Sequence, residues 1–507
     1  MKKYISHVLM ALLYSMGCLA QSMDDAIRYA RPELKGTARY MAMGGAFNAL
    51  GGDFSAIKDN PASAAVFLNS EFGVSINSIN NDINANYFGN NNTVDSRAFD
   101  IEQFGFVLVL NDTDNSDFSK IGLAYNYQVE QNFNEKFNVV GVNNNNGLDN
   151  YFLYHGYGID SEDMRIRDKE IDRYGENGAY RYVYDFLGGL YGFSGQQAFL
   201  GFQGYLIDEN GFDANGNKIF RSFSNPENNP VTHDFFVTHT GKNIKHTFTL
   251  SSQYQDKLYI GFNLNSHRSE FTRIDDLLEN NYGSGANISE SNFINELFTL
   301  GNGFSFQLGT IYKPKKNIRL GLSYQSPTWY KMTDEFKQYM NTSSRNGVDL
   351  DHIYFDYNLS TPSKISGGLA YIFRSKGLIS VQYDRMFFQN TLFDIRNGDI
   401  NFMNQNKKIE NTLQSASTLK VGGEYRMNQL SLRGGYFKQY SFNKLTDDLS
   451  NGYSLGLGYD FGGSILSIAL VQQERLRSER LYQEGLTDQF LLKNEQLQFI
   501  VSYLLKL

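Results

Sequence analysis

The stretch Ile121–Glu130, IGLAYNYQVE, alternates strictly between two kinds of residue. Its odd positions are apolar or aromatic, and its even positions are polar or small. A period of two is typical of a β-strand with one apolar and one polar face. The same alternation recurs in Ile318–Gln325, Leu419–Arg426 and Tyr453–Asp460. The sequence therefore predicts a β-rich chain from residue 69 onward.

The connections between such stretches indicate which kind of β protein this is. We expect fourteen strands, at residues 69–80, 101–111, 119–132, 244–254, 257–274, 303–313, 317–332, 351–373, 378–392, 415–426, 429–440, 451–461, 464–476 and 493–507. Short connections such as 112–118 and 255–256 alternate with long ones, which we expect at 81–100, 133–243, 275–302 and 393–414. Short turns on one side and long loops on the other are the signature of an outer-membrane barrel, and an even strand count places both chain ends on the periplasmic side. The sequence predicts an all-β transmembrane fold, a 14-stranded antiparallel outer-membrane β-barrel.

Pro362 lies inside the predicted strand 351–373, although proline normally interrupts a central strand. Splitting the strand there would give fifteen strands, an odd number. We therefore expect one long strand with a kink at this proline. The last strand alternates up to Leu507, a form that the barrel-assembly machinery is expected to recognise.

The composition excludes several other classes of protein. The 507 residues carry a net charge of −8 and a single cysteine. One cysteine cannot build a disulfide framework, and an acidic chain lacks the basic surface of a nucleic-acid binder. Gly192–Gln196 is close to a nucleophile elbow but lacks its final glycine, and no histidine pair has metal-ligand spacing on a helix. We expect no catalytic residues, no metal and no cofactor.

Residues 1–20 have the form of a secretory signal peptide. Two lysines precede an apolar stretch that is too short to span a bilayer, and small residues precede Gln21. Cys18 offers a lipoprotein alternative, but Ser15 stands where a lipobox has leucine. We expect an exported, monomeric protein of the bacterial outer membrane, in contact with its lipid and lipopolysaccharide.

Residues 21–68 do not alternate and are rich in glycine. A polar segment of this length is too short to be an independent domain, and a barrel of fourteen strands is wide enough to need filling. We expect an N-terminal hatch inside the lumen, followed by the barrel at 69–507; the alternative is a periplasmic tail.

The predicted loop 133–243 is the largest and contains a cluster of apolar residues: Leu187, Leu190, Tyr191, Phe193, Phe199, Leu200 and Phe202. These residues indicate a folded cap. They could present a surface to a hydrophobic solute or pack together as the core of the cap. In the loop 275–302, the spacing within Ser291–Phe298 predicts one or two helical turns.

Two stretches resemble the FadL/TodX family of long-chain fatty acid and hydrocarbon transporters. Ala38–Ala62, ARYMAMGGAFNALGGDFSAIKDNPA, is similar to the family's hatch and its NPA motif, here Asn60, Pro61 and Ala62. Phe304–Pro327, FSFQLGTIYKPKKNIRLGLSYQSP, is similar to a strand pair of the family. The resemblance implies a hatched 14-stranded barrel that takes up hydrophobic molecules passively. It also implies a ligand pocket inside the barrel and lateral exit through a gap at a kink in the third strand, here residues 119–132.

A fatty acid would need an apolar site with one or two basic or hydrogen-bonding groups. Arg319, Lys420, Arg426 and Arg433 face the predicted lumen and are the candidates for this role. Each of them could instead pair with an inward acid such as Glu424.

Two other functions remain open from the sequence. The very large loop could serve as a docking surface if the barrel were a non-transporting accessory of a secretion or surface-attachment system. A haemin-binding receptor could use His233 and His239 in the outer loops.

Overall fold

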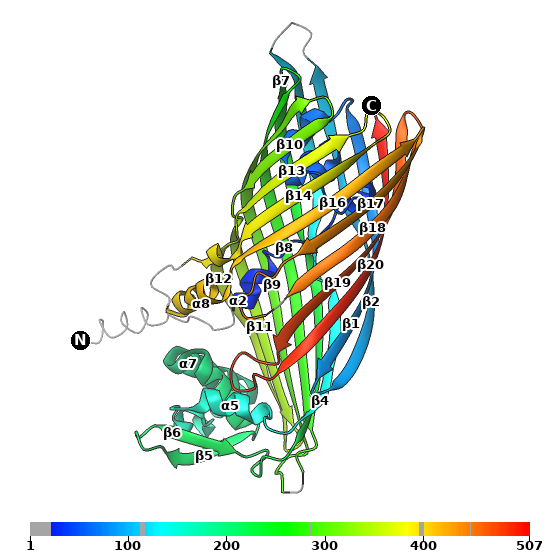
Figure 1. Ribbon diagram of the computed structural model, residues 1–507. Helices are drawn as coiled ribbons and strands as arrows, with labels where there is room; N and C mark the ends of the chain where they lie inside the picture. The colour runs from blue at the N-terminus through cyan, green and yellow to red at the C-terminus, as the bar shows by residue number, and fades with distance from the viewer. Residues whose placement is uncertain (1–21, 112–116, 284, 395–399, 447) are drawn as a thin grey trace, which may run out of the picture.

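The computed structural model describes residues 22–111, 117–283, 285–394, 400–446 and 448–507. The predicted signal peptide lies outside these residues, as does most of the connection predicted at 112–118. Within the described part, one antiparallel sheet closes on itself because β1 pairs with β20 (Figure 1).

The barrel has fourteen strand positions in the described residues. Ten positions hold one strand each: β1 (Glu71–Tyr87), β2 (Asn90–Asn111), β7 (Val231–Tyr254), β8 (Leu258–Asn280), β9 (Glu290–Lys315), β16 (Ser415–Met427), β17 (Leu430–Gln439), β18 (Leu449–Asp460), β19 (Ser464–Arg480) and β20 (Gln489–Lys506). Four positions hold two segments in line: β3 (Phe118–Asn132) with β4 (Glu135–Asn143), β10 (Ile318–Gln325) with β11 (Trp329–Thr342), β12 (Arg345–Ser360) with β13 (Lys364–Ile372), and β14 (Gly377–Phe387) with β15 (Leu392–Phe393). The predicted 14-stranded antiparallel barrel is confirmed.

The expected parity and the expected kink are both present. Glu71 pairs in register with Lys506, so the barrel begins and ends at the same end, where the short turns lie. Pro362 separates β12 from β13, and the neighbouring position is interrupted between β10 and β11. The amide of Thr361 donates to the carbonyl of Thr328 at 3.0 Å, which joins the two interruptions.

Four details of the predicted long-loop side are wrong. Both ends of the expected loop 133–243 are strand, in β4 and β7. The expected loop 81–100 is strand, because β1 and β2 continue to a tight turn at Phe88 and Gly89. Most of 275–302 is likewise strand, and Ser291–Phe298 pairs with β11 instead of forming helical turns. Beyond the membrane the outward face of a strand no longer needs to be apolar, so these extensions lack the apolar-outward alternation that marks the membrane wall.

The hatch fills the lumen and consists of α2 (Met23–Arg28), α3 (Ala38–Ala42), α4 (Phe54–Asp59) and the 3₁₀ turn η1 (Pro61–Val66). Its short helices begin at polar caps; the Asp53 carboxylate, for example, accepts from the amide of Ser55 at 2.9 Å. Glycines of the wall let the hatch approach the strands. A Cβ at Gly261 would lie 2.3 Å from the backbone of Pro61, and one at Gly435 would lie 2.2 Å from the amide of Gly44.

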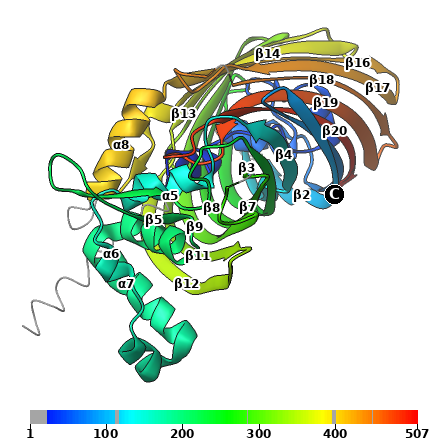
Figure 2. The same cartoon turned by 90° about the horizontal axis from the view of Figure 1, so that it is seen from below.

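Most of the connection between β4 and β7 folds into a cap (Figures 1 and 2). The cap comprises α5 (Leu148–Gly156), α6 (Ser161–Met164), α7 (Asp168–Gln203) and the hairpin β5 (Ile207–Phe212) and β6 (Lys218–Ser222). Positive φ angles of 72° at Gly175 and 65° at Gly192 break α7 into shorter helical pieces, one of which projects away from the barrel in Figure 2.

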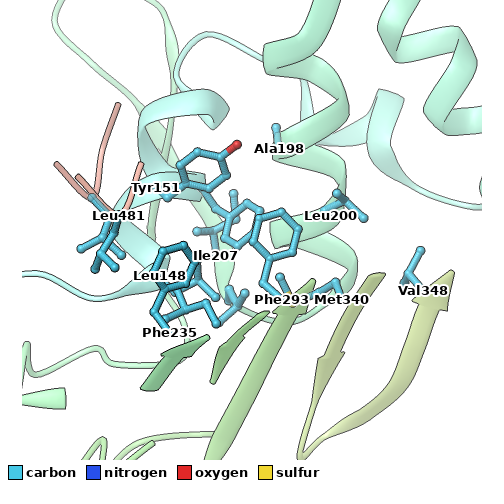
Figure 3. Packing of buried hydrophobic residues seen from close by; sticks show 14 of the residues in the cluster. Leu148, Tyr151, Ala198, Leu200, Ile207, Phe235, Phe293, Met340, Val348 and Leu481 are labelled. Carbon is cyan, nitrogen blue, oxygen red and sulfur yellow. The ribbon is translucent and has the colours of Figure 1, made fainter. Parts of the chain in front are cut away.

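The apolar residues predicted in the cap divide between its core and its surface. Leu187, Phe199 and Leu200 are buried, whereas Leu190 is 53% exposed. Figure 3 shows part of the core, where Tyr151 and Leu200 of the cap pack above Phe293 and Met340 of the extended strands. The cap is therefore folded, and its apolar core is continuous with the long strands beneath it.

Two further short elements, η2 (Phe388–Asn390) and α8 (Ile400–Thr412), lie between β14 and β16. No helix among the described residues is long and apolar enough to cross a membrane.

Candidate functional site

A charged cavity of about 100 Å³ lies in the lumen between the hatch and the outer mouth of the barrel. The hatch contributes residues 32–34, Tyr40, Lys58 and Asp59, and the remaining lining residues come from the barrel. Eight ionisable side chains carry its charge: Lys58, Lys245, Lys364, Lys420, Glu33, Asp59, Glu130 and Asp384. We call this space the lysine cavity.

Three of the four lysines are paired with carboxylates. Lys245 lies 2.6 Å from Glu130 and Lys420 lies 2.9 Å from Asp384. Lys364 lies 3.8 Å from Asp59, which belongs to the hatch. The last pair links the wall to the hatch, whereas the other two join residues of the wall, and the three together hold most of the charge of the cavity in balance.

Lys58 is the exception. No carboxylate of the described residues lies within ion-pair distance of its Nζ, which donates to the carbonyl of Lys35 at 2.5 Å. Burial, with Lys245 and Lys420 nearby, lowers the pKa of the Lys58 ammonium to about 7. A buried ammonium without a carboxylate partner is costly, and an incoming anion would relieve that cost.

An aromatic chamber lies next to the lysine cavity on its outer side. The hatch helix α2 places Met23, Ala26 and Ile27 in this chamber. The wall and outer loops surround them with aromatic residues: Phe133, Phe271, Tyr330, Tyr357, Phe388, Phe393 and Phe442. The guanidinium of Arg28 lies 3.9 Å from the centre of the Phe271 ring. An apolar part of the lumen thus adjoins the charged cavity and is occupied by a short helix.

The wall beside the lysine cavity has an interrupted ladder. β2 and β3 pair only as far as Gln103 and Gln128. Past this point each strand carries one extra residue without a register partner. Glu102 of β2 has no partner in β1, and Glu130 of β3 has no partner in β7. Bulges of this kind bend a strand and break its pairing.

Beyond the two bulges, residues 90–102 of β2 pair only with β1, and β4 pairs only with β7. Among the described residues, no backbone hydrogen bond joins these two edges. The edges meet again near the hairpin tip, where the side-chain amide of Asn90 donates to the backbone carbonyl of Val140 at 2.8 Å. We call this interval the wall gap.

The hatch lies directly behind the wall gap. Lys35 lies 3.4 Å from Glu102, and both side chains are buried. The amide of Asn132 donates to Glu33 at 3.2 Å, and Gln131 donates to the carbonyl of Arg28 at 2.7 Å. Residues 28–35 therefore connect the aromatic chamber, the lysine cavity and the gap.

This architecture can be compared with known proteins. Residues 235–462 match the family model described as outer membrane protein transport protein (OMPP1/FadL/TodX). The chain has the fold of the FadL/TodX-type barrels. This family consists of transport proteins rather than enzymes, and a barrel of this type spans the bacterial outer membrane.

Solved FadL/TodX-type barrels share the fold at low sequence identity. The crystal structure of a Pseudomonas aeruginosa FadL homologue superposes with a TM-score of 0.55 at 13% identity, covering 94% of this chain and 99% of the homologue. The P. putida toluene transporter TodX gives a TM-score of 0.52 at 13% identity, with coverage of 94% and 99%. The CymD monoaromatic hydrocarbon channel gives 0.51 at 11% identity, with the same coverage. A search of curated proteins finds no significant match to the sequence.

The NPA motif of this FadL/TodX-type barrel fastens the hatch to the wall. The side-chain amide of Asn60 donates to the carbonyls of Asn48 and Thr310, at 2.8 and 2.9 Å. Pro61 and Ala62 lie against Gly261 of β8. The motif is thus placed as a wedge between hatch and strands, outside the lysine cavity.

The four basic residues predicted for the lumen are not brought together. Only Lys420 lines the lysine cavity. Arg319 donates to the carbonyl of Leu50 in the hatch. Arg426 and Arg433 each place Nε 2.8 Å from Glu424. This ion pairing is the role that the sequence offered for them in place of ligand binding.

Sequence reasoning missed Lys58, Lys245 and Lys364. Lys58 lies in the hatch, where no alternation assigns a face. Lys245 lies at an odd position beside His246, and the alternation of Thr247, Thr249 and Ser251 marks its face as the lumen. That signal could have identified Lys245.

The other candidate groups have local partners. His233 lies 2.7 Å from Glu279 and 3.0 Å from the Tyr87 hydroxyl, and His239 lies 3.4 Å from Glu135. No cluster of His, Cys, Asp or Glu suited to a metal ion is found in the described residues.

Ser194, next to the kink at Gly192, lies 3.1 Å from His155. No carboxylate within the described ranges pairs with that histidine, so the pair lacks the third member of a triad.

Proposed function

We propose that this protein mediates passive uptake of hydrophobic compounds across the outer membrane, and that its cargo is an amphiphile with a carboxylate, such as a long-chain fatty acid. The observation that carries the proposal is the position of Lys58. This ammonium faces a cavity with no carboxylate partner of its own, and an aromatic chamber adjoins the cavity. A neutral hydrocarbon would use only the chamber, whereas a fatty acid matches both.

The lysine cavity is too small for a whole fatty acid. Its volume of about 100 Å³ is below the roughly 300–1,000 Å³ of typical ligand pockets. We expect it to hold the carboxylate while the acyl chain takes the space of α2 in the aromatic chamber. The helix has only six residues, and isolated helices of that length are marginal in water. Its displacement therefore costs little helix stability of its own.

Release through the wall gap completes the proposed route. The gap adjoins Glu130 of the lysine cavity, and residues 28–35 of the hatch lie behind it. Movement of α2 would pull on these residues and loosen the contacts that cover the gap. A hydrophobic cargo leaving sideways would enter the bilayer without crossing the aqueous periplasm.

Uptake of labelled oleate by a deletion strain tests the proposal. The strain is complemented with the wild type, with Lys58→Gln, or with Lys257→Gln as a matched control on an exposed turn. We expect wild type and Lys257→Gln to restore uptake and Lys58→Gln to reduce it by about tenfold, the effect of losing roughly 1.4 kcal/mol. Equal uptake with Lys58→Gln would contradict the role of the cavity. Unchanged uptake of every apolar solute in the deletion strain would contradict the function itself.

A further inference from the structure

A hollow of about 590 Å³ lies on the membrane-facing side of the wall, across β14, β16 and β17. Its floor is made by three glycines, Gly377, Gly423 and Gly434. Its rim is formed by exposed apolar side chains: Phe373, Ile379, Tyr425 and Leu432. It lies at the short-turn end of these strands, which is the periplasmic end. We call it the outer groove.

The register of the strands explains the hollow. Gly423 pairs with Gly434 across β16 and β17, so two neighbouring outward positions carry no side chain. The next outward pair, Tyr425 and Leu432, is large and closes the periplasmic side. Gly377 is the register partner of Tyr425 on β14 and extends the hollow toward the turn at residues 373–376.

Neither central glycine is required by the fold. A Cβ at Gly423 would have its nearest heavy atom at 3.6 Å, and one at Gly434 at 3.8 Å, which are ordinary contact distances. This differs from the lumen glycines such as Gly261, where the hatch leaves no room. Strand interiors usually carry larger residues, because glycine weakens a strand and packs nothing. The open space at this position is therefore not explained by packing inside the protein.

Positive charge lies at the periplasmic end of the outer groove. Arg374 and Lys376 belong to the turn between β13 and β14, and both are exposed. Neither forms an ion pair within the described part of the chain, whereas the nearby Arg426 is already paired with Glu424. Arginine and lysine bind phosphate through charge-assisted hydrogen bonds. Both side chains lie at the end of the wall where the headgroups of the inner leaflet are found.

We propose that the outer groove binds one glycerophospholipid of the periplasmic leaflet, with an acyl chain over Gly423 and Gly434 and the phosphate against Lys376 and Arg374. Bulk lipid tails are as apolar as leucine, so the hydrophobic effect does not select this site. Shape selects it, because an unfilled hollow loses dispersion contacts that a flexible chain restores. The volume is in the range of ligand pockets. The site is on the outside of the barrel and is independent of the cargo.

Native mass spectrometry of the protein in detergent micelles with added phosphatidylglycerol tests this inference. Gly423→Leu with Gly434→Leu fills the groove. Gly367→Leu is the matched control, since Gly367 is an outward glycine of β13 with no atom within 4 Å of its Cβ position and lies outside the groove. Lys376→Gln with Arg374→Asn removes the charge. Heat-modifiable migration on gels verifies that each variant is folded.

We expect wild type and Gly367→Leu to retain one phosphatidylglycerol, and the filled and charge-depleted variants to retain at least about fivefold less. Equal retention by the folded, filled variant would overturn the site. Equal loss in Gly367→Leu would overturn it as well, because retention would then reflect the general lipid surface. If lipid from native membranes co-purifies in the groove but carries no phosphate, the assignment to a phospholipid is wrong.

Discussion

Lys35 of the hatch lies 3.4 Å from Glu102 of β2, and both side chains are almost completely buried. Glu102 is the extra residue at the bulge where the β2–β3 ladder ends. The ion pair therefore joins the hatch to the edge of the wall gap. We therefore expect the closure of the gap to depend on the conformation of the hatch.

Breaking this pair from one side should loosen the hatch. Lys35→Met leaves the Glu102 carboxylate buried without its partner, a change that typically costs about 3–5 kcal/mol. We expect a lower unfolding temperature and a larger ion leak in planar bilayers. Lys35→Met with Glu102→Leu removes both fully buried charges and leaves only Glu33, which lies 3.8 Å from Lys35 and is about one-third exposed, so the double variant should recover most of the thermal stability. A single variant as stable and as tight as wild type would contradict the role of the pair.

The close approach of hatch and wall should make Gly261 intolerant of substitution. Gly261→Ala places a Cβ 2.3 Å from the Pro61 backbone, so the NPA wedge must move. We expect a lower yield of folded barrel, measured by heat-modifiable migration. Gly367→Ala adds the same methyl group to an open outward position and should behave like wild type. Similar folding yields for the two variants would show that the wedge is not tightly packed.

The cap should depend on pH through His155. Burial lowers the pKa of this imidazole to about 4. Because that value is below the unfolded pKa of 6.5, the contribution of neutral His155 is complete above pH 6.5 and is lost as the pH falls toward 4. The limit is about 3 kcal/mol, from roughly 1.4 kcal/mol per pKa unit.

Asp149 complicates the measurement, because burial raises its pKa to about 6 and its contribution is lost as the pH rises. The comparison is therefore between wild type and His155→Gln at each pH, by hydrogen exchange of the α5 amides. We expect the protection of wild type relative to the variant to fall as the pH drops from 7 to 4.5. A ratio that is independent of pH would contradict the assignment.

Cargo affinity should also depend on pH. The pKa of Lys58 is lowered to about 7 by burial, so its ammonium is lost as the pH rises above 7. A bound carboxylate needs the charged form, and binding therefore takes up a proton at higher pH. We expect the Kd for oleate to rise by up to about tenfold per pH unit between pH 7.5 and 9, and to rise less in Lys58→Gln. Titration calorimetry in two buffers measures both the affinity and the proton uptake.

The barrel wall could be predicted from the sequence because its signal is local. Alternation defines each strand, and the parity of the connections fixes the count. The extensions of β1, β2 and β9 were missed because they lie beyond the membrane wall. In β1, for example, the apolar Ile83, Ala85 and Tyr87 point inward and alternate with polar outward residues, which is the reverse of the apolar-outward pattern of the wall. The Ser291–Phe298 spacing was misleading because Phe293 and Leu297 fit both a helical and a strand period.

The site was harder to predict because its parts are far apart in the chain. Lys58, Lys245, Lys364 and Lys420 come from the hatch and three different strands, and only the closed barrel brings them together. The wall gap was also hidden. Ile121–Glu130 alternates without interruption, yet Val129 is buried together with Gln128, because the strand bulges there. Such a bulge depends on the neighbouring strands and not on the strand's own sequence.

The affinity of the purified protein for oleate and for oleyl alcohol, measured under the same conditions at pH 7, tests the central claim most directly. The two molecules share their acyl chain and differ in the carboxylate that we assign to Lys58. The account predicts that wild type binds oleate at least about tenfold more tightly than the alcohol, and that Lys58→Gln removes most of this preference while Lys257→Gln keeps it. Equal affinity of wild type for the two molecules, or an unchanged preference in Lys58→Gln, would contradict it.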